Sequence, residues 1–196
     1  MRQKVLVTDM DDVLVNLLDT WTSILNSRYS KNVKLEDIQE WDMHKAYPDL
    51  NDKQLFGVLN EDELWMQVRP KEGSPEYLLR VKDMGYRIFV CTAAHYKNIS
   101  KKITLCLLKY YPWLTYKDII MCHDKELISC DYIIDDYHNN IKRSKAVRFL
   151  MDAPYNKIAQ TSRDFDFRVN SMEDVYNILN EYELDKVLEE INDAQS

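Results

Sequence analysis

Short apolar runs that alternate with longer helical patterns constrain the fold of this chain most strongly. The runs span 5–7, 86–91, 119–121 and 132–134, with a fifth indicated at 146–151, and helical patterns cover 76–84, 97–110 and 172–191. Near-continuous apolar runs of this length, rich in β-branched residues, are typical of parallel strands covered on both faces. The alternation therefore predicts an α/β fold, a Rossmann-like doubly wound parallel sheet.

The interval between the first two predicted strands is much longer than one crossover requires, because strand–helix connections usually take about 2–6 residues. Helical patterns at about 13–29, 35–47 and 52–63 fill it. We therefore expect a core formed by residues 1–13 and 74–196 and a small helical cap formed by residues 14–73.

Three of the four tryptophans, Trp21, Trp41 and Trp65, lie in the predicted cap. A small subdomain needs large aromatic side chains because it has little core of its own. Aromatic faces also stack against nucleobases. Both interpretations stay open, and the second makes these residues candidates for a substrate pocket.

The overall charge and composition narrow the function classes. A net charge of −7 and a pI near 5.2 argue against a general binder of nucleic-acid polymers, which would show a basic stripe. No run reaches the roughly 18 apolar residues of a membrane helix. The four cysteines form no CxxC pair, so we expect them to be reduced thiols. The N-terminus has the pattern of a strand and not of a signal peptide. We therefore expect a cytoplasmic protein without membrane contact. The acidic C-terminal helix is expected to pack on the core or to form a homodimer.

Polar side chains follow four of the predicted strands at the point where each strand ends. They are Asp9, Asp11 and Asp12 after the first, Thr92 and Ala93 after the second, Lys125 after the third, and Asp135 and Asp136 after the fourth. In an open α/β sheet, ligands bind beyond the carboxyl ends of the strands. The four ends together predict one site.

These residue types suit phosphoryl transfer. A carboxylate such as Asp9 attacks an anionic phosphate only where a cation neutralises both, and Asp9 with Asp135 or Asp136 would give an oxygen site suited to Mg²⁺. Thr92 and Lys125 would hold phosphate oxygens. The acid two residues after Asp9, Asp11, would protonate the leaving oxygen and then activate water.

The same residues resemble the motifs of the haloacid dehalogenase-like phosphatases: DMDDVL at 9–14, Cys91-Thr92, Lys125 and Ile134-Asp135-Asp136. Within that superfamily, the segment CHDKELISCDYIIDD at 122–136, the position of the insertion and the Trp-rich stretch before Arg69-Pro70 are similar to the 5′(3′)-deoxyribonucleotidases, of pyrimidine 5′-nucleotidase type C. The similarity covers residues 3–150. It implies a phosphomonoesterase with Asp9 as nucleophile, Asp11 as acid/base and metal ligand through its backbone carbonyl, and Asp135 and Asp136 at the metal.

Three positions depart from the pattern of these relatives. Asp12 stands where many have Gly, and we expect it to cap the following helix. Ala93 stands where Ser is frequent, so only its backbone N–H can contact phosphate. Tyr137-His138 replaces a frequent Arg-Pro after the acidic pair. These changes leave the predicted hydrolytic residues in place.

Two alternatives remain. A different small phosphate ester, such as a sugar phosphate, would use the same chemistry. A phospho-accepting receiver module also places acids, a Thr and a Lys at strand ends, but it holds its acidic pair at the first strand and carries no cap. We expect a small-molecule phosphate ester, a (deoxy)nucleotide, as the substrate.

Overall fold

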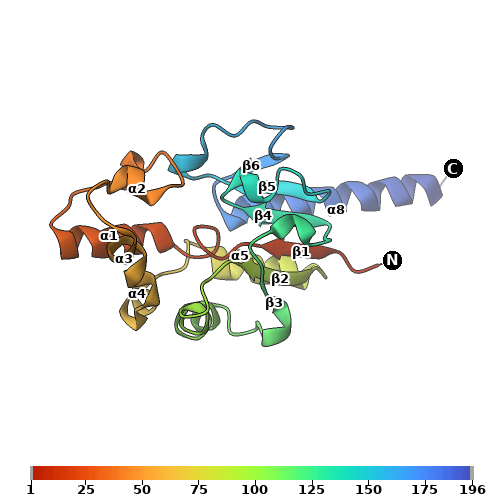
Figure 1. Ribbon diagram of the computed structural model, residues 1–196. Coiled ribbons are helices and arrows are strands. Elements are labelled where there is room, and N and C mark those ends of the chain that lie inside the picture. The colour runs from red at the N-terminus through yellow and green to blue at the C-terminus, as the bar shows by residue number, and fades with distance from the viewer. Residues whose placement is uncertain (1, 195–196) are drawn as a thin grey trace.

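The computed structural model describes residues 2–194, with side chains through residue 184, and its centre is a parallel sheet. The six strands are β1 Val5–Thr8, β2 Arg87–Thr92, β3 Ile119–Met121, β4 Tyr132–Asp135, β5 Val147–Met151 and β6 Phe167–Val169. Their order is β3-β2-β1-β4-β5-β6, with parallel pairing throughout (Figure 1). The predicted α/β fold with a parallel sheet is confirmed, and β6 is an addition.

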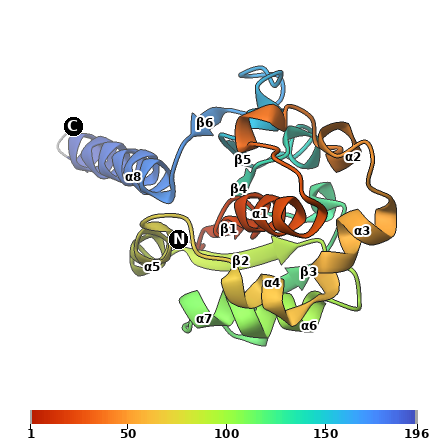
Figure 2. The ribbon, with the colours of Figure 1, turned by 90° about the vertical axis from the view of Figure 1, so that its left-hand side faces the viewer.

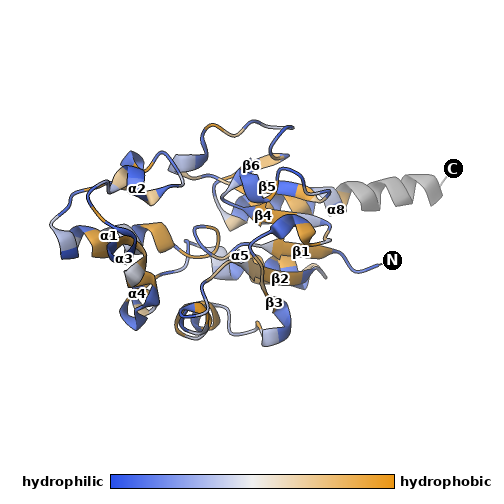
Figure 3. Ribbon diagram, viewed as in Figure 1, coloured by the Kyte–Doolittle hydropathy of each residue, from blue (hydrophilic) through white to orange (hydrophobic). Residues whose placement is uncertain are grey.

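Alternate residues of each strand enter two different apolar layers. Leu6, Ile88 and Ile134 belong to the larger cluster, whereas their neighbours Val7 and Ile133 belong to the smaller one. This period of two is expected for strands whose side chains point to opposite faces. Both faces of the sheet are therefore covered, and Figure 3 shows hydrophobic colours on the central strand β1, while most loops are hydrophilic.

The larger layer is closed by helices, and the smaller one mainly by short turns. Helices α5 (Ser74–Asp83) and α8 (Met172–Ala194) pack on each other against the sheet (Figure 2). The helix α5 ends where predicted, since Gly85 adopts the left-handed conformation with φ of 94°. On the other face, Ile141, Ala146 and Phe165 come from loops and short turns around η6 (His138–Asn140) and η7 (Pro154–Asn156).

The helix predicted over 97–110 is present but irregular. It consists of α6 Ile99–Lys101, the π-helical segment η3 Lys102–Leu107 and α7 Leu108–Tyr110. Short 3₁₀ turns flank β3, namely η4 Tyr116–Asp118 and η5 Lys125–Leu127. A π-helical segment widens the helix locally and is often found at functional sites, so the residues of η3 are candidates for such a site.

Between β1 and β2 lie the helices of the predicted cap. They are α1 Leu17–Tyr29, η1 Leu35–Asp37, α2 Met43–Ala46, α3 Asp52–Gly57, η2 Val58–Asn60 and α4 Asp62–Gln67. The helix expected over 35–47 is instead two short pieces joined by the loop 38–42. Helices α1 to α4 lie together beyond the carboxyl ends of the strands, opposite the two chain termini (Figure 1).

The two ends of this insertion run side by side. The backbone N–H of Asn16 donates to the carbonyl of Arg69 at 2.9 Å, and that of Lys71 donates to the carbonyl of Leu14 at 2.9 Å. The hydroxyl of Tyr111, from the core, donates to the same Leu14 carbonyl at 2.9 Å. These bonds hold the entry and exit of the insertion at a fixed position relative to β1. None of the described helices combines the length and hydrophobicity that a membrane crossing needs.

Candidate active site

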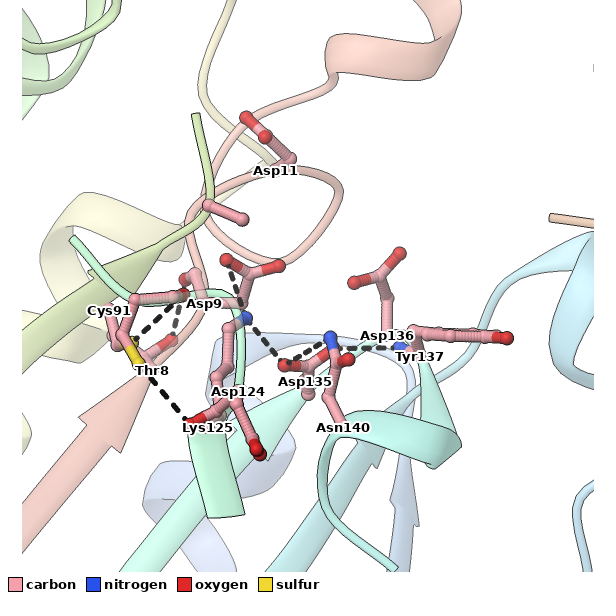
Figure 4. Close-up of polar contacts among 12 residues, drawn as sticks. Thr8, Asp9, Asp11, Cys91, Asp124, Lys125, Asp135, Asp136, Tyr137 and Asn140 are labelled. Carbon is pink, nitrogen blue, oxygen red and sulfur yellow. Dashed lines mark hydrogen bonds and ion pairs between the residues drawn. The ribbon is translucent and has the colours of Figure 1, made fainter. Parts of the chain in front are cut away.

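The polar residues predicted at the strand ends meet at one edge of the sheet. Asp9 directly follows β1, Thr92 ends β2, Asp135 ends β4 with Asp136 after it, and Lys125 opens η5 just beyond β3. Because the strands are parallel and β1 lies between β2 and β4, these ends are neighbours. Figure 4 shows the side chains of Asp9, Lys125, Asp135 and Asp136 side by side.

Lys125 joins two of the acids. Its Nζ lies 2.9 Å from Asp9 Oδ1 and 2.6 Å from Asp135 Oδ2, and the side chain is only 2% exposed. Burial by itself lowers the pKa of Lys125, but the charges of Asp135 and Asp9 outweigh burial and raise the pKa above its usual value. The ammonium is therefore permanently charged beside the carboxylate of Asp9.

Three carboxylates form a compact group of oxygen ligands. One carboxylate oxygen from each of Asp9, Asp135 and Asp136 lies within 4.8 Å of the others, and all three residues are buried. Among the described residues this is the only such group of acids, histidines or cysteines found.

The two acids at the end of β4 have different surroundings. Both oxygens of Asp135 are engaged, since the backbone N–H of Tyr137 donates to Oδ1 at 2.8 Å and Asn140 donates to both at 3.1 and 3.2 Å. Asp136 Oδ2 accepts from the hydroxyl of Tyr155. Asp136 Oδ1 is buried and has no hydrogen-bond partner in the described part of the chain, so it is the oxygen left free for a further ligand.

The charge balance of this group fits a bound cation. Burial raises the pKa of Asp136 well above its usual value, and the nearby charges of Asp135 and Asp9 raise it further. One ammonium, that of Lys125, faces three carboxylates. An oxygen-only set with excess negative charge suits a hard divalent cation, and the free Asp136 Oδ1 provides an unused ligand atom.

Asp11 lies apart from these carboxylates, in a tight loop after β1 (Figure 4). The loop closes through the backbone N–H groups of Leu14 and Val15, which both donate to the carbonyl of Met10, at 2.9 and 3.1 Å. Asp12 takes the left-handed conformation that the loop needs, with φ of 52°. Gly adopts positive φ most readily, and Asp is among the few other residues that tolerate it, so an Asp can occupy this position.

The expected capping role of Asp12 is confirmed. Its carboxylate accepts from the backbone N–H of Leu18, in the first turn of α1, at 3.0 and 3.2 Å. The residue at the N-cap position, Asn16, makes no such bond. Burial raises the pKa of Asp12 to about 7.

A buried lysine of the π-helical segment holds Asp11. Lys102 Nζ forms an ion pair with Asp11 Oδ2 and donates to the carbonyl of Ala93 at 3.2 Å. Its ammonium also lies 5.6 Å from the ring centroid of Trp65. Burial raises the pKa of Asp11, while Lys102 opposes the rise. Asp11 Oδ1 has no partner in the described part of the chain.

The side-chain hydroxyl of Thr92 is a hydrogen-bond donor without an acceptor among the described residues. Its side chain is fully buried at the end of β2, and its Oγ1 makes no hydrogen bond to the described residues. Buried hydroxyls almost always have a partner, so Thr92 fits a hydroxyl that waits for a ligand oxygen. Ala93, the next residue, is exposed at the edge of the site.

A cleft of about 1060 Å³ opens beside Asp11. Its walls come from the insertion (Phe56, Leu59, Asn60 and Trp65), from the segment after β2 (Ala93, His95, Asn98 and Lys102) and from the residues after β3. The acid Asp11 thus faces a space that is bounded by both the insertion and the core.

Of the three tryptophans in the insertion, only Trp65 lines this cleft. Trp21 is buried, and its Nε1 donates to the carbonyl of Leu55 at 2.9 Å, which joins α1 to α3. Trp41 is half exposed and stacks on Tyr137 at 4.7 Å, beside a second hollow. Trp21 and Trp41, the other two candidates for a substrate pocket, do not line this cleft. Phe56, which is 40% exposed, stands there instead.

Sequence reasoning missed Lys102, Tyr155, Asn140 and Phe56. For Lys102 a signal exists, because it lies three residues after Ile99 and four before Cys106, on the apolar face of its helix, where an unpaired lysine would be costly. Tyr155 and Asn140 contact Asp136 and Asp135 from the short 3₁₀ turns η7 and η6, and nothing in the local sequence marks them.

The fold is that of the hydrolases of the haloacid dehalogenase (HAD) class. A HAD family hydrolase from Deinococcus radiodurans, solved with bound phosphate and sodium, superposes with a TM-score of 0.61 at 12% identity, over 91% of this chain and 96% of that one. A magnesium-bound HAD hydrolase from Bacillus subtilis has a TM-score of 0.58 at 12% identity, over 92% of this chain and 100% of that one. At this identity the likeness shows the fold.

The family model described as "5' nucleotidase, deoxy (Pyrimidine), cytosolic type C protein" matches residues 3–185, and the chain belongs to this family. It is 30% identical over 157 residues to the 5′(3′)-deoxyribonucleotidase of Bacillus subtilis strain 168, covering 79% of this chain and 88% of the relative. The protein of the same name from Clostridium acetobutylicum is 27% identical over 157 residues, covering 80% and 86%. The resemblance inferred from the motifs is thereby confirmed.

Proposed function

We propose that this protein is a Mg²⁺-dependent phosphomonoesterase that hydrolyses (deoxy)nucleoside monophosphates to nucleoside and phosphate. The observation that carries the proposal is the division of the acids into two places. Asp9 lies with Lys125 and the acidic pair, whereas Asp11 faces the cleft from the next loop. One group can thus receive the phosphoryl group while the other serves the leaving oxygen. Family membership and the 5′(3′)-deoxyribonucleotidase relatives support the substrate class.

Asp9 is the nucleophile of this proposal. Its carboxylate attacks phosphorus, the bond to the leaving oxygen breaks, and an aspartyl-phosphate forms. Lys125 keeps Asp9 Oδ1 in place at 2.9 Å and offers positive charge to the transferred group. The unpartnered hydroxyl of Thr92 and the backbone N–H of Ala93 bind the remaining phosphate oxygens.

Asp11 is the acid/base. Burial raises its pKa, which favours the protonated form that donates to the leaving oxygen. The resulting carboxylate then takes a proton from water as that water attacks the aspartyl-phosphate. Lys102 keeps the carboxyl oriented in both states, because its ammonium is also anchored by the Ala93 carbonyl.

Mg²⁺ would be held by Asp9, by Asp136 through its free Oδ1 and by the backbone carbonyl of Asp11. Asp135, whose oxygens already accept from Lys125, Tyr137 and Asn140, would support the site from behind. When bound, the cation neutralises negative charge on the nucleophile and on the phosphate.

Residues 14–73 act as a cap in this proposal, with residues 1–13 and 74–196 as the core. The cap supplies Phe56, Asn60 and Trp65 to the cleft, and it encloses the part of the substrate beyond the phosphate. Since Lys102 lies over Trp65, the exposed ring of Phe56 is the better stacking surface for a base. A small enclosed site also favours a small ester over a nucleic-acid polymer.

We propose the cytoplasm as the compartment. The four cysteines are free thiols, and the family description names a cytosolic protein. A reducing compartment keeps such thiols unpaired.

The test is a phosphate-release assay with Mg²⁺ on nucleoside 5′- and 3′-monophosphates, deoxy and ribo, beside a series of sugar phosphates. We expect many turnovers per chain and the highest kcat/KM on a deoxynucleoside monophosphate. If a sugar phosphate has the highest kcat/KM, the protein is a sugar phosphatase and not a nucleotidase. Retention of about one phosphate per chain without release would indicate a receiver module.

A further inference from the structure

The side-chain oxygens of two asparagines that line the cleft lack hydrogen-bond partners among the described residues. The Oδ1 atoms of Asn60 and Asn98 are buried and accept no hydrogen bond from the described residues. Both residues line the cleft beside Asp11, and Asn98 is only 6% exposed. Buried polar side chains nearly always have a partner. Two orphaned amides in one cleft therefore point to a ligand that supplies the missing groups.

Asn98 lies at a defined position relative to the acid/base. It precedes Lys102 by four residues, so the two side chains lie on the same side of the helix, about 6 Å apart along its axis. Lys102 itself contacts Asp11. Asn98 also occupies the position before α6 where an amide commonly caps the helix, yet its side chain makes no capping bond. Asn98 and Asp11 both line the cleft, so the amide is available to a ligand that also reaches Asp11.

Asn60 reaches the cleft from the insertion. Its backbone carbonyl accepts from Lys101 Nζ at 2.7 Å, and the same ammonium pairs with Asp62 at 2.6 Å. Lys101 therefore fixes this edge of the insertion to the helix that follows Asn98. The two amides face the cleft from separate walls, one on the insertion and one on the core.

We propose that Asn98, assisted by Asn60, binds a hydroxyl group on the sugar of the substrate. This inference rests on the proposed function. The leaving oxygen at Asp11 is bonded to the sugar, so the other sugar oxygens lie only a few bonds away, within the same cleft that Asn98 and Asn60 line. A hydroxyl both donates and accepts, so it satisfies an amide in either orientation. Asn98 is therefore a specificity-determining residue for the nucleoside part of the ester.

The test compares three substrates on one variant. Asn98→Leu keeps the volume of the side chain and removes its polar atoms. The substrates are a 2′-deoxynucleoside 5′-monophosphate, its 2′,3′-dideoxy analogue and p-nitrophenyl phosphate. We expect kcat/KM of the variant to fall about tenfold on the deoxynucleotide. On the other two, which lack the hydroxyl, it should change by less than about twofold. Ser100→Ala, an exposed position on the same helix, is the control and should change nothing.

Stability provides a second measurement. Because Asn98→Leu removes a buried amide without a partner, the variant should melt at or above the temperature of the parent protein. Asn98→Ala and Asn60→Ala should show the same selective loss on the deoxynucleotide, so the inference does not depend on one replacement. A purely structural role would instead lower the melting temperature and reduce kcat/KM equally on all three substrates.

Two outcomes separate this inference from the proposed function. If the parent protein releases phosphate from p-nitrophenyl phosphate but from no nucleotide, the proposed function fails and this inference fails with it. If the parent protein hydrolyses the deoxynucleotide and the Asn98 variants do so equally well, the proposed function stands and only the sugar contact is overturned. An equal loss on all three substrates also overturns it.

Discussion

Lys102 and Asp11 form a buried ion pair between the helix that follows β2 and the loop that follows β1. The ammonium has two further contacts, the carbonyl of Ala93 and the ring of Trp65, so its position is fixed from the core and from the insertion. The side chain that orients the proposed acid/base is therefore also the one that touches the insertion. A change at this point should affect proton transfer more than phosphate binding.

Replacing Lys102 tests that relationship. Lys102→Met keeps the apolar stem but removes the charge that opposes the burial-raised pKa of Asp11. The pKa of Asp11 should therefore rise further, so the carboxylate needed to activate water forms only at higher pH. We expect kcat to fall about 10²-fold near neutral pH and the pH optimum to move upward. Lys109→Met, an exposed lysine on the same helical stretch, should leave the pH–rate profile unchanged. An unshifted optimum in Lys102→Met would contradict the pairing.

Replacing Asp9 tests the nucleophile. Asp9→Asn retains the shape of the side chain but not its charge or its nucleophilicity, so phosphate release should fall by about 10⁴-fold or more. Asp19→Asn, at an exposed acid in the first turn of α1, is the matched control and should keep full activity. Circular dichroism of both variants checks that the fold is retained. Substantial turnover by Asp9→Asn would exclude Asp9 as the attacking group.

The metal dependence should follow the different surroundings of the two acids. A chelator should stop phosphate release, Mg²⁺ should restore it, and Mg²⁺ should raise the melting temperature because it binds the folded state. Tyr155→Phe removes the hydroxyl that orients Asp136, so half-maximal activity should require about tenfold more Mg²⁺. Tyr137→Phe, which keeps the backbone N–H that contacts Asp135, should not alter the requirement. Titration of activity with Mg²⁺ measures both, and equal behaviour of the two variants would argue against Asp136 as a direct ligand.

Asp12 should make the stability of the protein depend on pH. Its pKa in the folded state, about 7, lies above the ordinary value of 3.8. The folded state thus binds this proton more tightly than the unfolded chain, so stability falls as pH rises from 3.8 toward 7 and then levels off. Asp12→Asn, which tolerates positive φ and can still accept from Leu18, removes this dependence.

Urea unfolding at pH 5 and pH 7.5, with chelator present, measures the effect. Because solvent reaches part of the Asp12 side chain, we expect the parent protein to lose about 1–2 kcal/mol more than Asp12→Asn between these pH values. Identical pH dependence in the two proteins would show that the carboxyl is not held in its neutral form.

The sheet could be predicted because its strands are apolar on both faces. The runs at 5–7, 86–91, 119–121, 132–134 and 146–151 all became strands. The strand β6 has three residues with Arg168 in the middle, so no apolar run marks it. The helix expected over 35–47 is interrupted because Trp41, in the loop 38–42, stacks on Tyr137 of the core. A tertiary contact of this kind overrides local helical preference.

Part of the site could also be predicted from the sequence, and part could not. Asp9, Asp135, Asp136 and Lys125 could be placed together from topology alone, since parallel strands end at one edge. The contacts that distinguish Asp135 from Asp136 come from Asn140 and Tyr155, which lie in the short turns η6 and η7, whose positions the sequence pattern does not determine. The roles of the tryptophans were undecided for the same reason. A homodimer through the C-terminal helix stays a prediction.

The most direct test of the account is to identify the residue that carries the phosphoryl group during turnover. The parent protein and Asp11→Asn are each mixed with Mg²⁺ and a deoxynucleoside monophosphate that carries a labelled phosphate. The reaction is quenched in acid, and the protein is then digested and analysed by mass spectrometry. Asp11 acts in both steps, so in the variant the intermediate forms slowly and is also hydrolysed slowly, and a longer incubation should allow it to be detected. The account predicts the label on Asp9 and its absence in Asp9→Asn. Steady release of phosphate with an unlabelled Asp9, or a label on another residue, would contradict it.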